Sequence, residues 1–103
     1  MASELYELKE QYSVTILGAV DGVREGHPVG ISISIEQFED CLPLLEQLHN
    51  LGALDKKNLD HLKSMIQTVV RILRKNLLDE RKIAGELMET ILSKSRELGL
   101  IVL

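Results

Sequence analysis

Three histidines and one cysteine are the residues in this chain best suited to metal binding or nucleophilic catalysis. His27, His49 and His61 are far apart in sequence, and none has a histidine or cysteine partner at the short spacing typical of a zinc site. Cys41 follows the apolar period of its segment, so we expect a small buried hydrophobic side chain rather than a nucleophile. The sequence therefore predicts no catalytic residue, no metal ligand and no cofactor, and a protein that is not an enzyme.

The composition is that of one folded domain. Of 103 residues, 45% are hydrophobic and 27% are charged, which is ordinary for a globular chain and too apolar for a disordered one. The net charge of −4 argues against a general nucleic-acid partner. No apolar run has the length of a membrane span, and the first residues lack a signal pattern. We expect one helical domain over residues 1–103, located in the cytoplasm.

Charged residues are distributed unevenly along the chain. The first half is acidic, and the region around the end of the segment Asp55 to Leu77 is basic, with Lys63, Arg71, Arg74, Lys75, Arg81 and Lys82. One interpretation is that these charges are the solvated faces of amphipathic helices. The other is that the acidic surface of one copy meets the basic surface of another copy. In the second interpretation, the candidate partner-binding residues are Arg71, Arg74 and Lys75 on the basic side and Glu7, Glu10, Glu39 and Asp40 on the acidic side.

The most regular segment runs from Asp55 to Leu77. Its apolar residues recur at steps of three and four, which is typical of one face of an α-helix. Asp55 stands at the position of an N-cap, and basic residues close the segment, where they suit the helix dipole. We expect this helix to be the centre of the core, with its apolar face formed by Leu59, Leu62, Ile66, Val69, Leu73 and Leu77.

The first segment, residues 3–25, allows two structures. Apolar residues at helical spacing predict one helix that ends at Gly26. A β-branched cluster and two glycines instead favour a β-hairpin in which residues 14–20 pair with residues 29–35. We favour the helix, because its period begins at Leu5 and continues through the ambiguous part.

The second segment combines a strand-like pattern with a helix signal. Residues 29–35 alternate apolar with small residues, which predicts an extended or β segment. Ser34 and Gln37 then match the capping box that opens a helix, and that helix is expected to end near Leu51. Because Pro43 lies inside the helical pattern, we expect a kink or two short helices.

A last helix is predicted from Asp79, as its N-cap, to about Glu97, before a glycine stop. Its apolar face comprises Ile83, Leu87, Met88, Ile91 and Leu92. The apolar tail, residues 100–103, either closes the bottom of the core or contributes to an interface. Together these segments predict a mainly all-α fold: a compact antiparallel bundle of four to five helices, with a short extended or β segment around residues 29–35.

Residues 44–63, followed by residues 71–78, contain a leucine-rich helix, a short loop and a helix opened by an acidic cap. This stretch resembles the third to fifth helices of a death-effector domain, and residues 5–11 resemble the first helix of that family. That family carries an Arg-x-Asp-Leu motif, which Arg74 and Leu77 match, with Asn76 in place of the aspartate. The resemblance adds Leu77 to the candidate partner-binding residues and implies homotypic assembly in cell-death signalling.

Two classes of function remain. The first is a non-enzymatic interaction module, an adaptor in signalling that self-associates or binds a related helical domain through complementary charge and apolar surface. The second is a structural or regulatory bundle that forms an obligate homodimer through apolar surface, including residues 31–35 and 100–103. Both predict a homo-oligomer or a protein partner. A third class, a small-ligand pocket around Tyr12 and Phe38, lacks any spacing that specifies a ligand.

Overall fold

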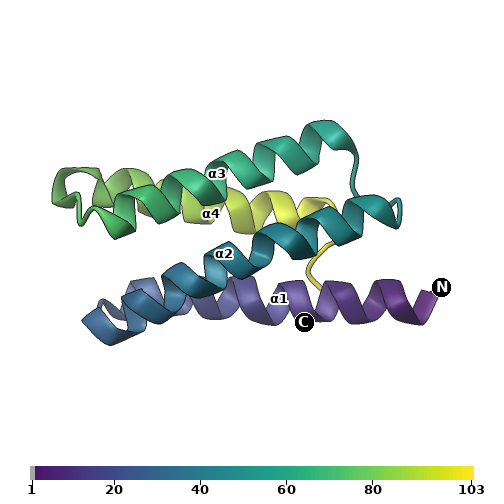
Figure 1. The fold of residues 1–103 in the computed structure, drawn as a ribbon, viewed down its shortest axis with the longest axis horizontal. Coiled ribbons are helices and arrows are strands. Elements are labelled where there is room, and N and C mark those ends of the chain that lie inside the picture. Colours follow the sequence, from purple (N-terminus) through teal and green to yellow (C-terminus); the bar gives the residue numbers. More distant parts are fainter. Residues whose placement is uncertain (1) are drawn as a thin grey trace.

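The computed structural model describes residues 2–103, and over this range the chain forms four long α-helices joined by short connections (Figure 1). No strand occurs in these residues, and the all-α antiparallel bundle is confirmed. The bundle is elongated, with extents of 42 × 24 × 19 Å. The elements are α1 (Ala2–Glu25), α2 (Pro28–Asn50), α3 (Lys56–Arg74), the 3₁₀ turn η1 (Leu78–Glu80) and α4 (Arg81–Glu97).

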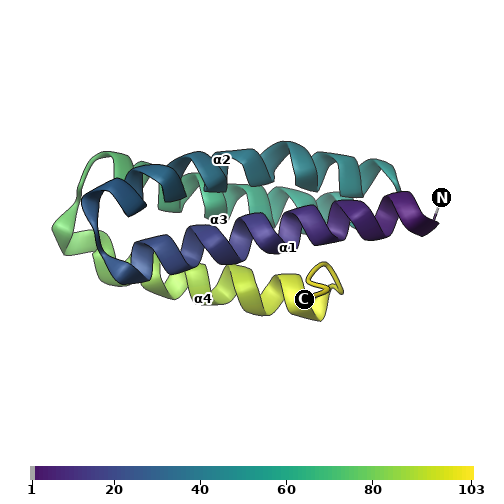
Figure 2. The same cartoon turned by 90° about the horizontal axis from the view of Figure 1, so that it is seen from below.

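Successive helices are antiparallel neighbours. Contacts join α1 to α2, α2 to α3 and α3 to α4, and α4 packs back on α1 (Figure 2). The helices α1 and α3 each pack against both α2 and α4. Therefore α1 and α3 lie on opposite sides of the bundle. The connections α1–α2 and α3–α4 share one end, and the N-terminus and the α2–α3 connection lie at the other (Figure 1).

The central helix predicted from the apolar period is present as α3. Asp55 caps it, since its Oδ1 accepts a hydrogen bond from the Asn58 backbone N–H at 2.8 Å. The helix ends at Arg74, earlier than expected, because Asn76 adopts a left-handed backbone conformation with φ 51°. Leu77 therefore lies outside the helix and is half-buried. The other predicted apolar residues are buried: Leu59, Leu62, Ile66, Val69 and Leu73.

The prediction of an extended or β segment at residues 29–35 is wrong, because α2 already begins at Pro28. The His27 Nδ1 accepts from the Val29 backbone N–H at 3.3 Å, and a proline at the first helical position has the required φ. Ser34 is thus an interior residue of α2, and it is buried. Packing against α1 outweighs the strand propensity of the isoleucines.

The helix α2 also continues through Pro43, so of the two predicted alternatives, a kink or two short helices, the second is wrong. Proline removes the hydrogen bond that the Glu39 carbonyl would accept within the helix. Pro43 is exposed, so that carbonyl can accept from water instead. The turns on either side are anchored in the core by Cys41 and Leu45, which are fully buried.

The first segment is a single helix, and the hairpin is excluded. Its glycines lie where α1 and α2 approach closely. A Cβ atom on Gly22 would overlap the Ser34 Oγ and lie 3.1 Å from the Gly30 carbonyl oxygen. A Cβ atom on Gly18 would lie 3.1 Å from the Gln37 Nε2. Glycine lowers the stability of a helix, and the close packing of α1 on α2 that it permits offsets this loss.

The C-terminal region differs from expectation at its start. Asp79 lies in η1 rather than at an N-cap, and the residue before α4, Glu80, makes no capping hydrogen bond through its side chain. Ile83, in the first turn of α4, is exposed, whereas the next residue, Ala84, is buried, so Ile83 lies outside the buried face of the helix on which it was predicted. The tail closes the core: Leu100 is fully buried, and the Val102 N–H donates to the Ser13 Oγ at 3.0 Å.

Candidate interaction surfaces

The two halves of the chain carry opposite charge, and each half forms one pair of adjacent helices. Residues 1–50, which contain α1 and α2, have nine acidic and two basic side chains, a net charge of −7. Residues 51–103, which contain α3 and α4, have seven acidic and ten basic side chains, a net charge of +3. The fold therefore places an acidic helix pair against a basic one.

Ion pairs within the chain join these two helix pairs. Glu39 of α2 pairs with Arg74 of α3, and the Lys63 Nζ of α3 lies 2.5 Å from the Glu46 Oε1 of α2. The hydrogen bond from Lys63 lowers the pKa of Glu46. Two of the predicted partner-binding residues, Glu39 and Arg74, thus contact each other in one molecule. Part of the charge complementarity assigned to a partner acts inside the fold.

The other predicted residues are distributed over both ends of the bundle. Glu7 and Glu10 lie on the N-terminal half of α1, whereas Arg71 and Lys75 lie at the opposite end, where α3 finishes (Figure 1). Asp40 lies near the middle of α2. All five are exposed, and none forms an ion pair with another of the residues that the structure describes.

Two exposed apolar side chains accompany the acidic residues on α1. Tyr6 is 52% exposed and Val14 is 56% exposed. Glu7, Glu10 and Val14 follow one another at steps of three and four, and Tyr6 lies four residues before Glu10, so the four side chains share one face of the helix. We name these four residues the acidic α1 surface.

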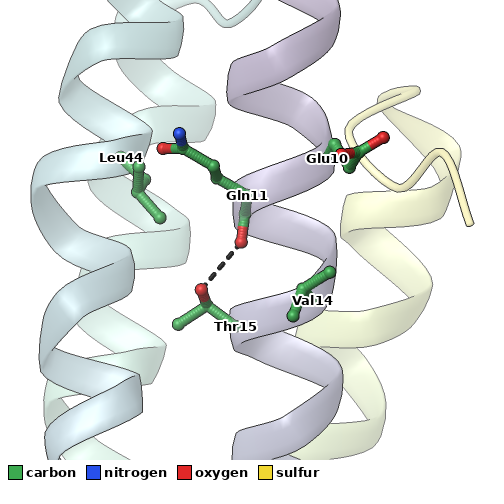
Figure 3. Close-up of a pocket in the computed structure, with 5 residues that line it drawn as sticks. All are labelled: Glu10, Gln11, Val14, Thr15 and Leu44. Carbon is green, nitrogen blue, oxygen red and sulfur yellow. Dashed lines mark hydrogen bonds between the residues drawn. The ribbon is translucent and has the colours of Figure 1, made fainter.

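A hollow of about 390 Å³ lies along this surface (Figure 3). Leu44, from α2, and Gln11 lie on one side of α1, and Glu10 and Val14 lie on the other. The Thr15 hydroxyl donates to the Gln11 carbonyl at 2.7 Å, so it is occupied within its own helix. The hollow therefore offers apolar carbon beside a carboxylate.

A second surface combines cations with apolar side chains where α3 meets α4. Leu78 is 71% exposed and Ile83 is 49% exposed. Arg71, Lys75 and Lys82 are exposed in the same stretch of chain. We name the five residues Arg71, Lys75, Leu78, Lys82 and Ile83 the basic corner. The neighbouring Arg81 donates through its Nη2 to the Asn76 Oδ1 at 3.1 Å.

A third exposed apolar pair lies on α2. Val29 and Ile33 are four residues apart, so they are neighbours on the helix surface, and both are exposed. No charge of either sign lies between them in the sequence. This pair therefore differs from the other two surfaces, in which charged residues accompany the apolar side chains.

The cysteine and two of the aromatic side chains are buried in the core. Cys41 is fully buried, and burial, with the Asp40 carboxylate as a second cause, raises the pKa of its thiol to about 12. Tyr12 is also fully buried, burial raises the pKa of its phenol, and its Oη lies 2.7 Å from the Ser95 Oγ. Phe38 packs in the same core and is likewise inaccessible. The two aromatic rings therefore present no face to a ligand.

The histidines lie apart from one another in the fold. His27 caps α2, His49 places its Nδ1 2.6 Å from the Leu54 carbonyl oxygen, and His61 is exposed on α3. Over residues 2–103, no group of three or more histidine, cysteine, aspartate or glutamate side chains could hold a metal ion. Within the same range, every helix is too short or too polar to cross a membrane.

No family model, curated protein or solved structure matches this chain. The segments on which the predicted resemblance to a death-effector domain rests lie in α1 (residues 5–11), from α2 into α3 (residues 44–63), and across the end of α3 to the start of η1 (residues 71–78). Sequence reasoning did not identify Tyr6, Val14 and Leu78 as exposed apolar side chains. All three fall outside the helical apolar stripes, and this displacement was the signal that could have identified them as exposed.

Proposed function

We propose that this protein is a non-enzymatic interaction module that associates with a second copy of itself or with a related helical domain. The observation that carries the proposal is that exposed apolar side chains lie beside exposed charge. Tyr6 and Val14 accompany the carboxylates of Glu7 and Glu10. In the basic corner, an excess of cations accompanies Leu78 and Ile83, although Asp79 and Glu80 lie in the same turn.

Such surfaces have a clear physical use. Exposed charge speeds and orients the encounter with an oppositely charged partner, whereas desolvated apolar side chains supply affinity. The resemblance to death-effector domains favours an adaptor role in signalling for such a module. We expect a cytoplasmic setting for it.

Molar mass in solution tests the proposal. Sedimentation equilibrium at about 20 mM and about 500 mM salt varies the Debye length from about 20 Å to about 4 Å. We expect a mass above the 11.6 kDa monomer at low salt, falling towards the monomer at high salt because the charges are screened. A monomeric mass at every concentration and both salts would contradict self-association.

A second candidate is an obligate homodimer through apolar surface. The exposed pair Val29 and Ile33 on α2 favours it. The tail does not serve it in this structure, because Leu100 is buried in its own chain. Such a dimer would be insensitive to salt, and Ile33→Asp would convert it to monomer. The same sedimentation series therefore separates the two candidates.

A further inference from the structure

We propose that copies of this chain associate head to tail, with the acidic α1 surface of one copy on the basic corner of the next. The inference rests on the proposed self-association and specifies its surfaces and its symmetry. Its occupant is a second copy, because the two surfaces of one chain are complementary in charge and both carry exposed apolar side chains.

The positions of the surfaces exclude contact between them in one molecule. The acidic α1 surface is near the N-terminus, and the basic corner is at the far end of the long axis (Figure 1). The helices that carry the charges, α1 and α3, also lie on opposite sides of the bundle. The two surfaces can therefore meet only between different molecules.

The charges that remain free match this arrangement. Arg74 is already paired with Glu39, and Arg24 of α1 is paired with Glu89 of α4. Arg71 and Lys75, one turn apart on α3, have no such partner among the described residues. They form a pair of cations suited to the carboxylates of Glu7 and Glu10, which are also one turn apart.

Each surface also has an apolar part. Leu78 projects from the short turn η1 and is the most exposed large apolar side chain in the described residues. The hollow along α1 is bordered by Val14 and Leu44 and opens beside Glu10. In the proposed contact, Leu78 of one copy occupies this hollow of the next, and its burial there supplies affinity between the flanking charges.

The symmetry has a measurable consequence. A two-fold dimer uses one surface patch on both copies and stops at two, whereas a head-to-tail contact leaves one free surface at each end. Unless the contact closes a ring, assembly continues with concentration. The wild-type protein at low salt should thus pass beyond the dimer.

Two double variants test the contact. Glu7→Lys with Glu10→Lys reverses the charge of the acidic α1 surface, and Arg71→Gln with Lys75→Gln removes two of the three cations of the basic corner, the pair that faces Glu7 and Glu10 in the proposed contact. Each variant should weaken self-association by about tenfold or more and remain monomeric. Their equimolar mixture should form a heterodimer and no larger species, because it contains one intact contact. Circular dichroism melts confirm that each variant is folded.

Matched variants control for net charge. Glu36→Lys with Glu86→Lys makes the same charge change as the first variant at exposed positions outside both surfaces, and Lys57→Gln with Arg96→Gln matches the second. Both controls should assemble like the wild type. Wild-type assembly that persists in both test variants, or a mixture that stays monomeric, would overturn the head-to-tail contact and leave self-association intact. A monomeric wild type would overturn both.

Discussion

The two sides of α1 are packed in opposite ways. Towards α2, the small residues Gly22, Gly30 and Ser34 bring the helix backbones close together. Towards α4, the gap is bridged by side chains: Tyr12 reaches Ser95, Arg24 reaches Glu89, and the tail packs over Ser13. On the side of α1 that faces α2, added side-chain atoms would therefore collide with the neighbouring helix. On the side that faces α4, removed side-chain atoms would leave a cavity.

This difference teaches which forces hold each side. The α1–α2 contact depends on the absence of side-chain atoms, so it gains from close dispersion contacts along the backbones. The α1–α4 contact depends on large side chains and on the burial of the tail. Substitutions that add or remove atoms should therefore have opposite consequences on the two sides.

The largest expected effect is on the α4 side, at the tail. Leu100→Ala should lower the free energy of unfolding by about 2–5 kcal/mol, because a fully buried leucine loses its contacts and leaves a cavity. Urea unfolding followed by circular dichroism measures the change. Leu103→Ala is the control, since Leu103 is 68% exposed and its truncation should change stability by less than about 0.5 kcal/mol. Equal effects would show that the tail does not close the core.

On the α2 side, adding one methyl group should be harmful. Gly22→Ala should destabilise by about 1–3 kcal/mol, since its Cβ overlaps the Ser34 Oγ, although alanine favours the helix. Gly85→Ala is the matched control: nothing lies within 4 Å of its added Cβ, so it should stabilise by about 0.5–1 kcal/mol. Ser34→Ala should partly rescue Gly22→Ala. A stabilising Gly22→Ala would contradict the close α1–α2 contact.

The Tyr12 hydroxyl, which bridges α1 and α4, should contribute less to the free energy of unfolding than the two sites above. Tyr12→Phe should cost about 1–2 kcal/mol, because the buried Ser95 hydroxyl loses its partner at 2.7 Å. A double-mutant cycle with Ser95→Ala measures the coupling between the two hydroxyls. Additive effects, with no coupling, would mean that the hydroxyls stabilise the fold independently.

Alkaline pH should lower the free energy of unfolding through Cys41, which lies on the side of α2 that faces the core. Burial raises the pKa of Cys41 to about 12 in the folded chain, above its value of about 8.5 in an unfolded one. The folded state therefore holds this proton more tightly than the unfolded state. The contribution of the thiol to the free energy of unfolding is complete below about pH 8.5 and is lost as the pH rises towards 12. The expected slope is about 1.4 kcal/mol per pH unit for one group. Cys41→Ala should reduce that slope in urea titrations between about pH 9 and pH 11.

Much of this fold follows from local patterns. The spacing of apolar residues in α3 and the Asp55 cap predicted the central helix, and Gly26 and Gly99 marked the ends of α1 and α4. Residues 29–35 were predicted incorrectly, because isoleucines alternating with small residues satisfy both a strand and a helix that packs on glycine. Only the contact between Gly22 and Ser34, far apart in sequence, decides between them.

The candidate surfaces were harder to predict for a related reason. Sequence reasoning grouped Arg74 with Arg71 and Glu39 with Asp40, since each pair carries like charge in one segment. The fold divides both pairs, because Arg74 and Glu39 meet between α3 and α2. Which charges remain free for a partner depends on helix rotation about the bundle, which charge patterns along the chain do not specify.

The smallest expected effect concerns the Arg24–Glu89 ion pair between α1 and α4. Both side chains are exposed, so solvent screens the attraction and the long arginine loses rotamer freedom when it is held. A double-mutant cycle of Arg24→Gln and Glu89→Gln, read from urea unfolding, should give a coupling of about 0.2–1 kcal/mol that declines at high salt. The Glu39–Arg74 pair, also exposed, should behave alike. A coupling above about 2 kcal/mol, insensitive to salt, would mean that charge rather than Tyr12 and the tail holds α4 against α1.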